Sequence, residues 1–174
     1  MDTGSQAAEQ YDAPHASGRY AVGSGGAALT IQRVGHVILR VRDLSKAKAF
    51  YQGVLGMSIA AESDRAVFFR FGGYHHDIGV FRAAPDAEQP KPEQLGLAHV
   101  AVLADDFETV KRMHARCKEM GVEIVGAKDH EVTKSLYIKD PEGNTIEIYW
   151  DDPSYDWQTK GVALVAHPLE LDET

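Results

Sequence analysis

Three side chains of this 174-residue chain could together bind a metal ion: those of His36, His99 and Glu147. Each histidine stands among apolar residues, in Gly35-His36-Val37-Ile38-Leu39 and in Ala98-His99-Val100-Ala101-Val102, and Glu147 alternates with Ile146 and Ile148. Two imidazoles and one carboxylate are the ligand set of a facial-triad Fe(II) site, which leaves positions open for substrate and dioxygen. Taken singly, each histidine also fits a hydrogen-bonded core residue, and Glu147 fits the solvent face of a strand.

Three further side chains could do proton chemistry beside such an ion. His76 precedes the apolar run from Ile78 to Phe81, His130 begins a polar stretch, and Tyr137 stands ten residues before Glu147. A histidine can transfer protons near neutral pH, and a phenol can hold a substrate oxygen. Taken singly, His130 fits a turn residue and Tyr137 a core aromatic with a satisfied hydroxyl. Because neighbouring strand residues face opposite ways, we expect only one of His75 and His76 to enter a cavity.

The elements that must position these residues occur twice in the same order, as strand, helix and three strands. The first copy is predicted at 34–41, 44–55, 57–61, 65–71 and 74–82, and the second at 97–103, 107–120, 122–127, 133–139 and 145–150. Asp43 or Ser45 is expected to cap the first helix and Asp105 or Asp106 the second, with Gly56 and Gly121 ending them. His36 and His99 stand 63 residues apart at equivalent positions, so a pseudo-twofold axis would bring them toward one shared cavity.

This pattern predicts an α+β fold of two tandem βαβββ modules. We expect a flexible tail at 1–29, one domain at 30–152, and a C-terminal tail at 153–174 in which 162–165 is a candidate short strand. Within the domain, module one is 30–82, a proline-containing linker is 83–94, and module two is 95–152. Helices outside the sheets fit the apolar residues spaced three and four apart.

Composition argues against several classes of protein. The net charge of −8 argues against a nucleic-acid partner, and the single cysteine excludes an intramolecular disulfide. No apolar run reaches the roughly 18–20 residues that cross a membrane, and the first residues lack the pattern of a signal peptide. We therefore expect a cytoplasmic protein without a membrane partner.

From Val34 to Asp152 the chain resembles the vicinal oxygen chelate superfamily of glyoxalases, bleomycin-resistance proteins and extradiol dioxygenases. The resemblance rests on Gly35-His36-Val37, on Asp43-Leu44 and on Ala49-Phe50-Tyr51-Gln52-Gly53-Val54-Leu55-Gly56-Met57. The string from Asp129 to Trp150 is similar to the type I extradiol, catechol 2,3-type dioxygenases. The resemblance implies a cup-shaped, half-open barrel around one metal.

It also implies a role for each candidate residue. His36, His99 and Glu147 would hold Fe(II), with Mn(II) as the alternative metal, and His76 beside Asp77 would be the catalytic histidine. His130 and Tyr137 would hydrogen-bond the substrate oxygens. The partners would be a small aromatic diol, dioxygen and further copies of the chain, as a homodimer or a higher homo-oligomer.

The chain departs from the well-studied dioxygenases, which have four modules where this sequence has one pair. The ring substituent of the substrate therefore stays open. A metal-dependent isomerase, lyase or thiol transferase resembling glyoxalase I, methylmalonyl-CoA epimerase or the fosfomycin enzymes is the alternative. In several of these a fourth ligand comes from the end of the first module, about where His75 and His76 stand. A metal-free drug-binding protein is the third choice.

Overall fold

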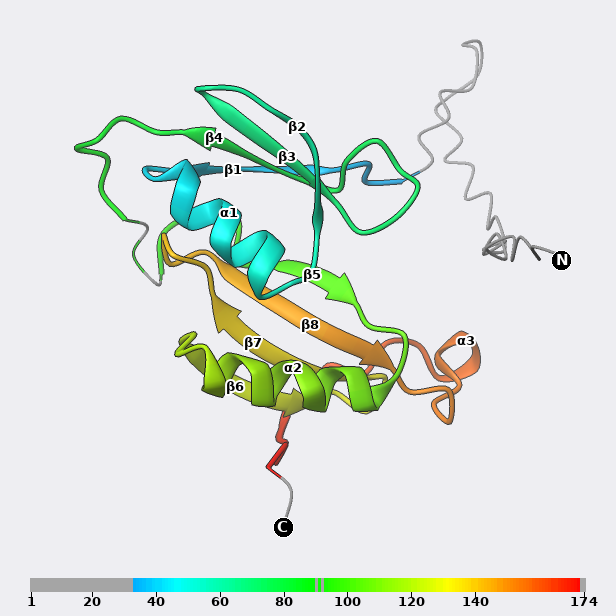
Figure 1. The fold of residues 1–174 in the computed structure, drawn as a ribbon. Helices are drawn as coiled ribbons and strands as arrows, with labels where there is room; N and C mark the ends of the chain where they lie inside the picture. The colour runs from blue at the N-terminus through cyan, green and yellow to red at the C-terminus, as the bar shows by residue number, and fades with distance from the viewer. Residues whose placement is uncertain (1–32, 90, 92, 173–174) are drawn as a thin grey trace, which may run out of the picture. The chain divides into compact units, whose positions relative to one another are not determined.

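The computed structural model describes residues 33–89, 91 and 93–172, so the predicted tail at 1–29 lies outside the described residues. The first module contains β1 (Val37–Val41), α1 (Leu44–Gly53), β2 (Ser58–Glu62), β3 (Ala66–Arg70) and β4 (Ile78–Arg82) (Figure 1). Its four strands form one mixed sheet in the order β1-β4-β3-β2, in which β1 and β4 are parallel.

The second module repeats this arrangement. It contains β5 (Val100–Leu103), α2 (Phe107–Glu119), β6 (Ile124–Asp129), β7 (Thr133–Lys139) and β8 (Thr145–Asp151). Its sheet has the order β5-β8-β7-β6-β9, where β9 (His167–Pro168) comes from the C-terminal segment. The prediction of an α+β fold with two βαβββ modules is confirmed, and both sheets are open rather than closed barrels.

Both helices begin at the aspartates that the sequence indicated. The Asp43 carboxylate accepts hydrogen bonds from the backbone N–H groups of Ser45 and Lys46, at 2.8 and 3.1 Å. The Asp106 carboxylate accepts one from the N–H of Thr109 at 2.6 Å. These bonds satisfy N–H groups that have no partner inside the first turn of a helix. Gly121, with a φ of 67°, follows the C-cap of α2 in a left-handed conformation that favours glycine.

Each helix covers one face of its own sheet. In β8, Ile146 and Ile148 are buried, and α2 contacts this strand as well as β6 and β7. In β4, Ile78 and Val80 are buried, and α1 contacts β3 and β4. Because strand residues alternate between faces, the residues between these core positions lie on the face away from the helix. We call this second face the open face of each sheet.

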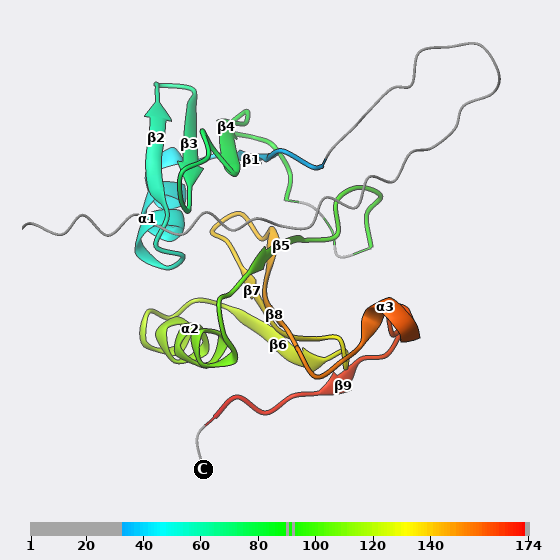
Figure 2. The same ribbon diagram turned by 90° about the vertical axis from the view of Figure 1, so that its right-hand side faces the viewer.

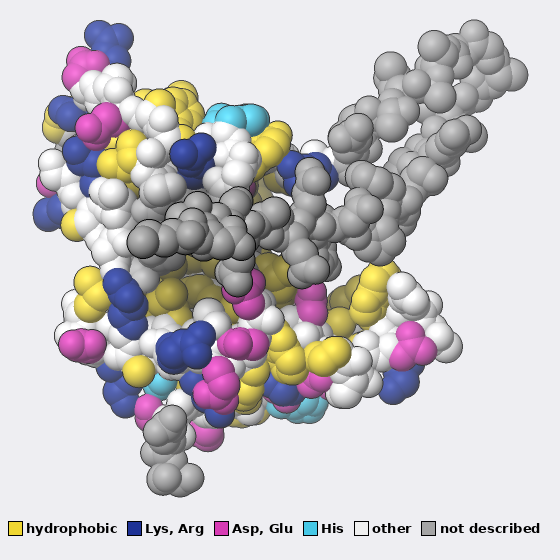
Figure 3. Space-filling view, turned by 45° about the vertical axis from the view of Figure 1, so that its right-hand side comes forward, with side chains coloured by type: hydrophobic (Ala, Val, Ile, Leu, Met, Phe, Trp, Pro, Cys, Tyr) yellow, Lys and Arg dark blue, Asp and Glu magenta, His cyan; other side chains and the backbone are white. Residues whose placement is uncertain are grey.

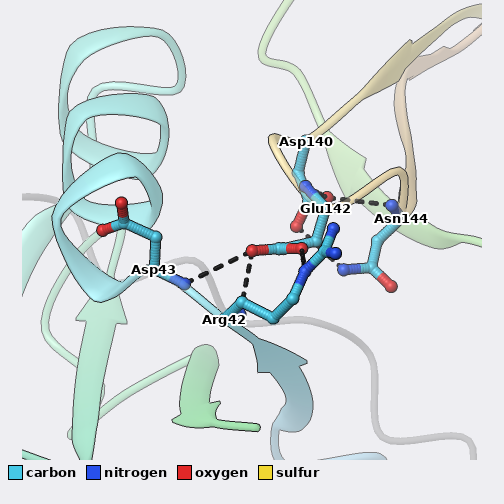
Figure 4. Close-up of polar contacts among 5 residues, drawn as sticks. All are labelled: Arg42, Asp43, Asp140, Glu142 and Asn144. Atoms are coloured by element: carbon cyan, nitrogen blue, oxygen red, sulfur yellow. Dashed lines mark hydrogen bonds and ion pairs between the residues drawn. The ribbon is translucent and has the colours of Figure 1, made fainter. Parts of the chain in front are cut away.

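The two modules contact each other through the turn between β7 and β8. The Glu142 carboxylate accepts hydrogen bonds from the backbone N–H and the Nε of Arg42, both at 2.8 Å, and from the N–H of Asp43 at 3.3 Å (Figure 4). The buried hydroxyl of Tyr51 donates to the Asp140 carboxylate at 2.9 Å. Asp140 also accepts from the N–H groups of Glu142 and Asn144, so its carboxylate fixes both the turn and the contact.

The structure corrects the predicted end of the first module. β4 begins at Ile78, so residues 74–77 belong to a loop and not to the strand expected at 74–82. The Asp77 carboxylate accepts a hydrogen bond from the backbone N–H of Phe71 at 2.9 Å, which closes this loop. His36 and His99 were expected within strands, but they directly precede β1 and β5.

The C-terminal segment also differs from the prediction. No strand forms at 162–165; instead a short helix α3 (Trp157–Lys160) precedes this stretch, and β9 follows it. β9 pairs with the edge strand β6, with His167 opposite Asp129 and Pro168 opposite Lys128. Figure 2 shows α2 and α3 on opposite sides of the second sheet, so this segment reaches the open face. In the described part of the chain, no helix has the length and hydropathy of a membrane span.

Candidate active site

Strand register brings three predicted residues together on the open face of the second sheet. Tyr137 of β7 stands opposite Glu147 of β8, and its hydroxyl donates to Glu147 Oε1 at 2.8 Å. β5 pairs with β8 on the other side, with Ala101 opposite Glu147, and His99 Nε2 lies 2.9 Å from Glu147 Oε2. Glu147 is 8% exposed, and these contacts account for both of its carboxylate oxygens.

His130, in the turn after β6, extends this chain of contacts. Its Nε2 lies 3.0 Å from the Tyr137 hydroxyl, and its Nδ1 lies 2.6 Å from the backbone carbonyl of Val165. Because a carbonyl oxygen only accepts, Nδ1 must carry a proton, and in the neutral imidazole Nε2 is then free to accept one. Tyr137 has a single hydroxyl proton, which it can give either to Glu147 or to His130.

The electrostatics keep that proton on the phenol. Burial, together with the hydrogen bond to the Glu147 carboxylate, raises the pKa of Tyr137 to about 12. The hydroxyl is therefore protonated at neutral pH and acts as a donor. A cation bound by Glu147 would occupy the carboxylate and leave the phenol proton for His130 or for a bound oxygen.

A cavity of about 350 Å³ lies beside these side chains. His130, Tyr137 and Glu147 line it together with Tyr149. Apolar side chains make up most of the remaining wall, and they come from β5, from the turn before β7 and from the C-terminal segment: Ala101, Val132, Val162 and Ala163. The arrangement suits a small molecule with a polar edge at the carboxylate and an apolar body.

The first module carries a second group of candidate residues, around His36. The ring of His76 lies 4.4 Å from that of His36 and 4.8 Å from that of Phe68, measured between centroids. His75 Nδ1 lies 2.6 Å from His76 Nδ1, so both histidines of the pair lie in this cluster. The expectation that only one of them could enter a cavity assumed a strand, and it does not apply to the loop at 72–77.

His76 has the environment of a reactive imidazole. Its Nε2 is buried and has no hydrogen-bond partner among the described residues. Loss of solvation, with smaller contributions from His36 and His75, lowers the pKa of His76 below its ordinary value. The ring is therefore neutral at neutral pH, and one of its nitrogens is available to a ligand or a proton.

The structure brings His99 and Glu147 together, but it does not bring His36 to them within one chain. Among residues 33–89, 91 and 93–172, no three His, Cys, Asp or Glu side chains are close enough to hold one metal ion. We call the His99–Glu147 pair and the His36–His76 cluster the two half-sites. Both lie on open faces, away from α1 and α2.

The donor chemistry of the half-sites nonetheless fits a divalent ion. Imidazole and carboxylate ligands bind such ions at about 2.0–2.2 Å, so two ligands at right angles lie about 3 Å apart. His99 Nε2 and Glu147 Oε2 lie 2.9 Å apart, which is a hydrogen-bond distance and is also compatible with two ligands of one ion. The partnerless Nε2 of His76 supplies a further nitrogen at the other half-site.

Comparison of the two modules shows a residue that reasoning from the sequence missed. β1 pairs with β4 as β5 pairs with β8, so Ile38 opposite Gly79 corresponds to Ala101 opposite Glu147. Gly79 therefore occupies the position of Glu147 in the first module. A Cβ at Gly79 would lie 2.5 Å from Ile38 Cδ1 and 3.0 Å from the Phe68 ring, so packing fills the place of a carboxylate. Alignment of the repeats through β4 and β8 would have shown this difference.

Comparison with known proteins identifies the class of protein. Residues 33–148 match the Glyoxalase/Bleomycin resistance protein/Dioxygenase superfamily, and the chain belongs to this family. It is 33% identical over 126 residues to the catechol-2,3-dioxygenase of Bacillus subtilis (strain 168), which covers 72% of this chain and 44% of that protein. It is 29% identical over 122 residues to biphenyl-2,3-diol 1,2-dioxygenase 3 of Rhodococcus globerulus, covering 69% of this chain and 64% of that protein. The chain thus spans about half to two thirds of these relatives.

Other similar proteins are not named as dioxygenases, and the match covers most of their length. The metallothiol transferase FosB of Lysinibacillus sphaericus (strain C3-41) is 26% identical over 125 residues, covering 70% of this chain and 84% of that protein. Among solved structures, lactoylglutathione lyase from Agrobacterium tumefaciens superposes with a TM-score of 0.56 at 23% identity, covering 69% of this chain and 94% of that one. The fosfomycin resistance protein FosX from Listeria monocytogenes gives 0.56 at 22% identity, with 71% and 97% coverage. The structural likenesses support the fold.

Proposed function

We propose that the protein is an Fe(II)-dependent extradiol dioxygenase that cleaves the ring of a catechol. The observation that carries this proposal is the run of contacts from His130 through Tyr137 and Glu147 to His99, beside a cavity with apolar walls. His36, His99 and Glu147 would hold the ion. Fe(II), when bound, supplies a Lewis acid and a template for the diol and dioxygen.

Tyr137 and His130 would act on the oxygens of the substrate. The Tyr137 hydroxyl donates to Glu147 Oε1. When substrate binds beside this carboxylate, the hydroxyl would donate to a catechol oxygen instead. His130, held through Nδ1 by the Val165 carbonyl, presents Nε2 to that hydroxyl and can accept a proton through it. This is the arrangement that general base catalysis requires, with base and substrate proton linked by hydrogen bonds.

His76 would work from the other side of the site as the proton donor during ring opening. Its lowered pKa leaves it neutral before the reaction, so it can first take up a proton and then deliver it. Its contact with Phe68, on the open face of β3, keeps the ring in an apolar environment in which hydrogen bonds and charges act strongly.

We infer that a second copy of the chain completes the site. Within one chain the modules contact each other through Arg42, Tyr51 and the turn between β7 and β8, and through Arg116 of α2, which donates to the Gly53 carbonyl. The half-sites remain on separate open faces. Large apolar side chains on these faces are exposed, including Ile38, Phe81 and Leu103. Figure 3 shows hydrophobic side chains gathered on the lower part of the viewed face, which belongs to the second module. Pairing of open faces would bury this surface and bring module one of one copy to module two of another.

A metal-dependent thiol transferase or isomerase of the same fold is the second candidate. The matched region covers 84% of FosB and 44% of the catechol-2,3-dioxygenase. A fourth protein ligand would then come from His76, since Gly79 supplies no carboxylate. The His130–Tyr137 pair, by contrast, has a direct use in the dioxygenase reaction.

The proposal is tested by anaerobic reconstitution with Fe(II), removal of excess iron, and measurement of oxygen uptake with a panel of catechols. We expect one dioxygen consumed per catechol and a yellow ring-fission product, with Glu147→Ala as the inactive control. Stoichiometric iron without oxygen uptake for any catechol would refute the dioxygenase assignment. Consumption of fosfomycin with a thiol and Mn(II) would establish the second candidate instead.

The shared site is tested by mixing two inactive variants, His36→Ala and Glu147→Ala. In a mixed dimer one site carries both substitutions and the other carries neither. Random exchange of subunits in a twofold dimer would therefore restore about a quarter of the parent activity. A site confined to one chain would give no recovery, and that result would contradict the inference.

A further inference from the structure

A stretch near the end of the chain joins the two faces of the second sheet. The carbonyl of Val165 lies on the open face, where it accepts a hydrogen bond from His130 Nδ1 at 2.6 Å. Further along, the carboxylate of Asp172 accepts one from Lys118 Nζ of α2 at 2.8 Å. Figure 2 shows the chain running from α3 through β9 at the edge of the sheet and on toward the side of α2. We call residues 165–172 the strap; they lie beyond residue 148, where the family match ends.

Backbone pairing alone holds the strap weakly. β9 consists of His167 and Pro168 alone, which stand opposite Asp129 and Lys128 of β6. The register of a strand is normally fixed by the burial of one of its faces. Both residues of β9 are exposed, so another contact must stop the strap from sliding along β6.

Leu171 supplies that contact. It is 6% exposed and belongs to the hydrophobic core, and Leu169 is partly buried against the same core. The ion pair of Asp172 with Lys118 joins two exposed side chains, and such pairs contribute little to stability. Burial of a leucine side chain contributes more. Leu171 is therefore the main anchor of the strap.

The register of the strap decides how the His130 ring is held. His130 directly follows Asp129 at the end of β6, and Val165 stands two residues before β9, so antiparallel pairing brings the Val165 carbonyl to the imidazole. Because the carbonyl accepts, Nδ1 keeps the proton and Nε2, 3.0 Å from the Tyr137 hydroxyl, presents a lone pair. If the strap slides or lifts, Nδ1 loses this partner, and the ring is free to take the other tautomer or to turn away from Tyr137.

We propose that Leu171 is a positioning residue for the reaction: by anchoring the strap in the core, it keeps the Val165 carbonyl on His130 Nδ1 and the His130 Nε2 toward Tyr137. This rests on the proposed function, because it assigns a remote support to the base of that mechanism. All of these contacts lie within one chain, so they do not depend on how a second copy completes the metal site.

The test compares Leu171→Ala with Leu44→Ala, a matched control in α1 of the first module, because both leucines are 6% exposed. In the Fe(II)-loaded protein, loss of one orienting hydrogen bond should lower kcat with catechol about 3–10-fold in Leu171→Ala. KM, iron content and the kcat of Leu44→Ala should stay close to the parent values. Leu171→Met, which nearly conserves volume, should keep parental turnover. If Leu171→Ala does not fold, Leu171→Val should show a smaller change in the same direction.

A double-mutant cycle separates positioning from a general loss of stability. In a His130→Ala background the residue that the strap positions is absent, so adding Leu171→Ala should leave kcat unchanged. If the two effects multiply instead, Leu171 acts through another part of the molecule and the proposal is overturned. An equal fall of kcat in Leu171→Ala and Leu44→Ala would overturn it as well.

A measurement without turnover separates this proposal from the dioxygenase assignment. In the metal-free protein with isotope-labelled histidine, NMR should show one ring with a protonated Nδ1 and an unprotonated Nε2 whose signals disappear in His130→Ala. Leu171→Ala should average the two tautomers of this ring, and Leu44→Ala should keep the parent signals. If no catechol is oxidised, the dioxygenase assignment fails, and this comparison still decides the role of Leu171. Unchanged His130 signals in Leu171→Ala would refute it.

Discussion

Replacing Tyr137 with phenylalanine removes one hydroxyl group from the centre of the site and leaves the ring in place. That hydroxyl lies 2.8 Å from Glu147 Oε1 and 3.0 Å from His130 Nε2, so the change breaks the link between the Glu147 carboxylate and His130. No ligand is lost, and we therefore expect the variant to bind iron with the parent's stoichiometry.

The two contacts set the size of the effect. A hydrogen bond to a charged acceptor contributes about 1.5–3 kcal/mol, so the metal-free variant should be less stable by about this amount. In the iron-loaded protein the proposed ion would occupy Glu147, and the loss of stability should be smaller. Loss of a donor to a reacting oxygen typically lowers kcat on the order of 10²-fold.

The measurements are iron content, steady-state oxygen uptake and thermal unfolding with and without iron. Tyr149→Phe is the matched control, because Tyr149 lines the same cavity but lies outside the His130–Tyr137–Glu147 contacts. We expect the control to keep turnover within about threefold of the parent, well below the effect of losing a catalytic donor. If Tyr137→Phe keeps parental turnover and loses only stability, Tyr137 is a core aromatic and the reasoning is wrong.

Three further predictions concern the metal ligands, His76 and the contact between the modules. Alanine at His36, His99 or Glu147 should abolish both iron retention and activity, and full iron in Glu147→Ala by elemental analysis would count against the ligand set. His76→Ala should keep stoichiometric iron while kcat falls on the order of 10²–10⁴-fold; loss of iron would move the assignment toward the four-ligand enzymes. Although burial opposes it, hydrogen bonds from Arg42 and Asp43 hold the pKa of Glu142 below its ordinary value. A lowered pKa stabilises the fold above the unfolded-state pKa, and this contribution disappears as the pH falls through the folded-state pKa. Glu142→Gln should therefore cost about 2 kcal/mol at pH 7 in urea unfolding, and less at pH 3, below the unfolded-state pKa. An equal cost at both pH values would contradict the assigned charge.

The features that could be predicted from the sequence are those fixed by local chemistry. An aspartate before an apolar helix caps it, as Asp43 and Asp106 do. Alternation in a strand places the Glu147 side chain on the other face of β8 from Ile146 and Ile148. The short turn from β7 to β8 pairs Tyr137 with Glu147. The contact between Tyr137 and Glu147 therefore follows from spacing and turn length alone.

The features that could not be predicted depend on contacts between distant or irregular parts of the chain. The loop at 72–77 closes through the Asp77 side chain, which competes with the strand that the apolar pattern indicated. The segment at 162–165 is apolar enough for a strand, but β9 takes the free edge of β6 and leaves this stretch at the cavity. The contact between the modules includes the ion pair of Arg42 with Glu142, which lies 100 residues further along the chain. No local sequence pattern predicts a pair so far apart.

Divergence between the two modules explains how a duplicated fold could yield one site with three protein ligands. Symmetry would give each module a histidine before its first strand and a carboxylate on its last, which makes four donors. The first module keeps His36 but has Gly79 where the second has Glu147, and the side chains of Ile38 and Phe68 occupy the space. Three donors leave coordination positions open for a diol and dioxygen, which a four-donor site would restrict. In the proposed dioxygenase, His76, whose buried Nε2 has no hydrogen-bond partner among the described residues, would then be free for proton transfer rather than being needed as a ligand.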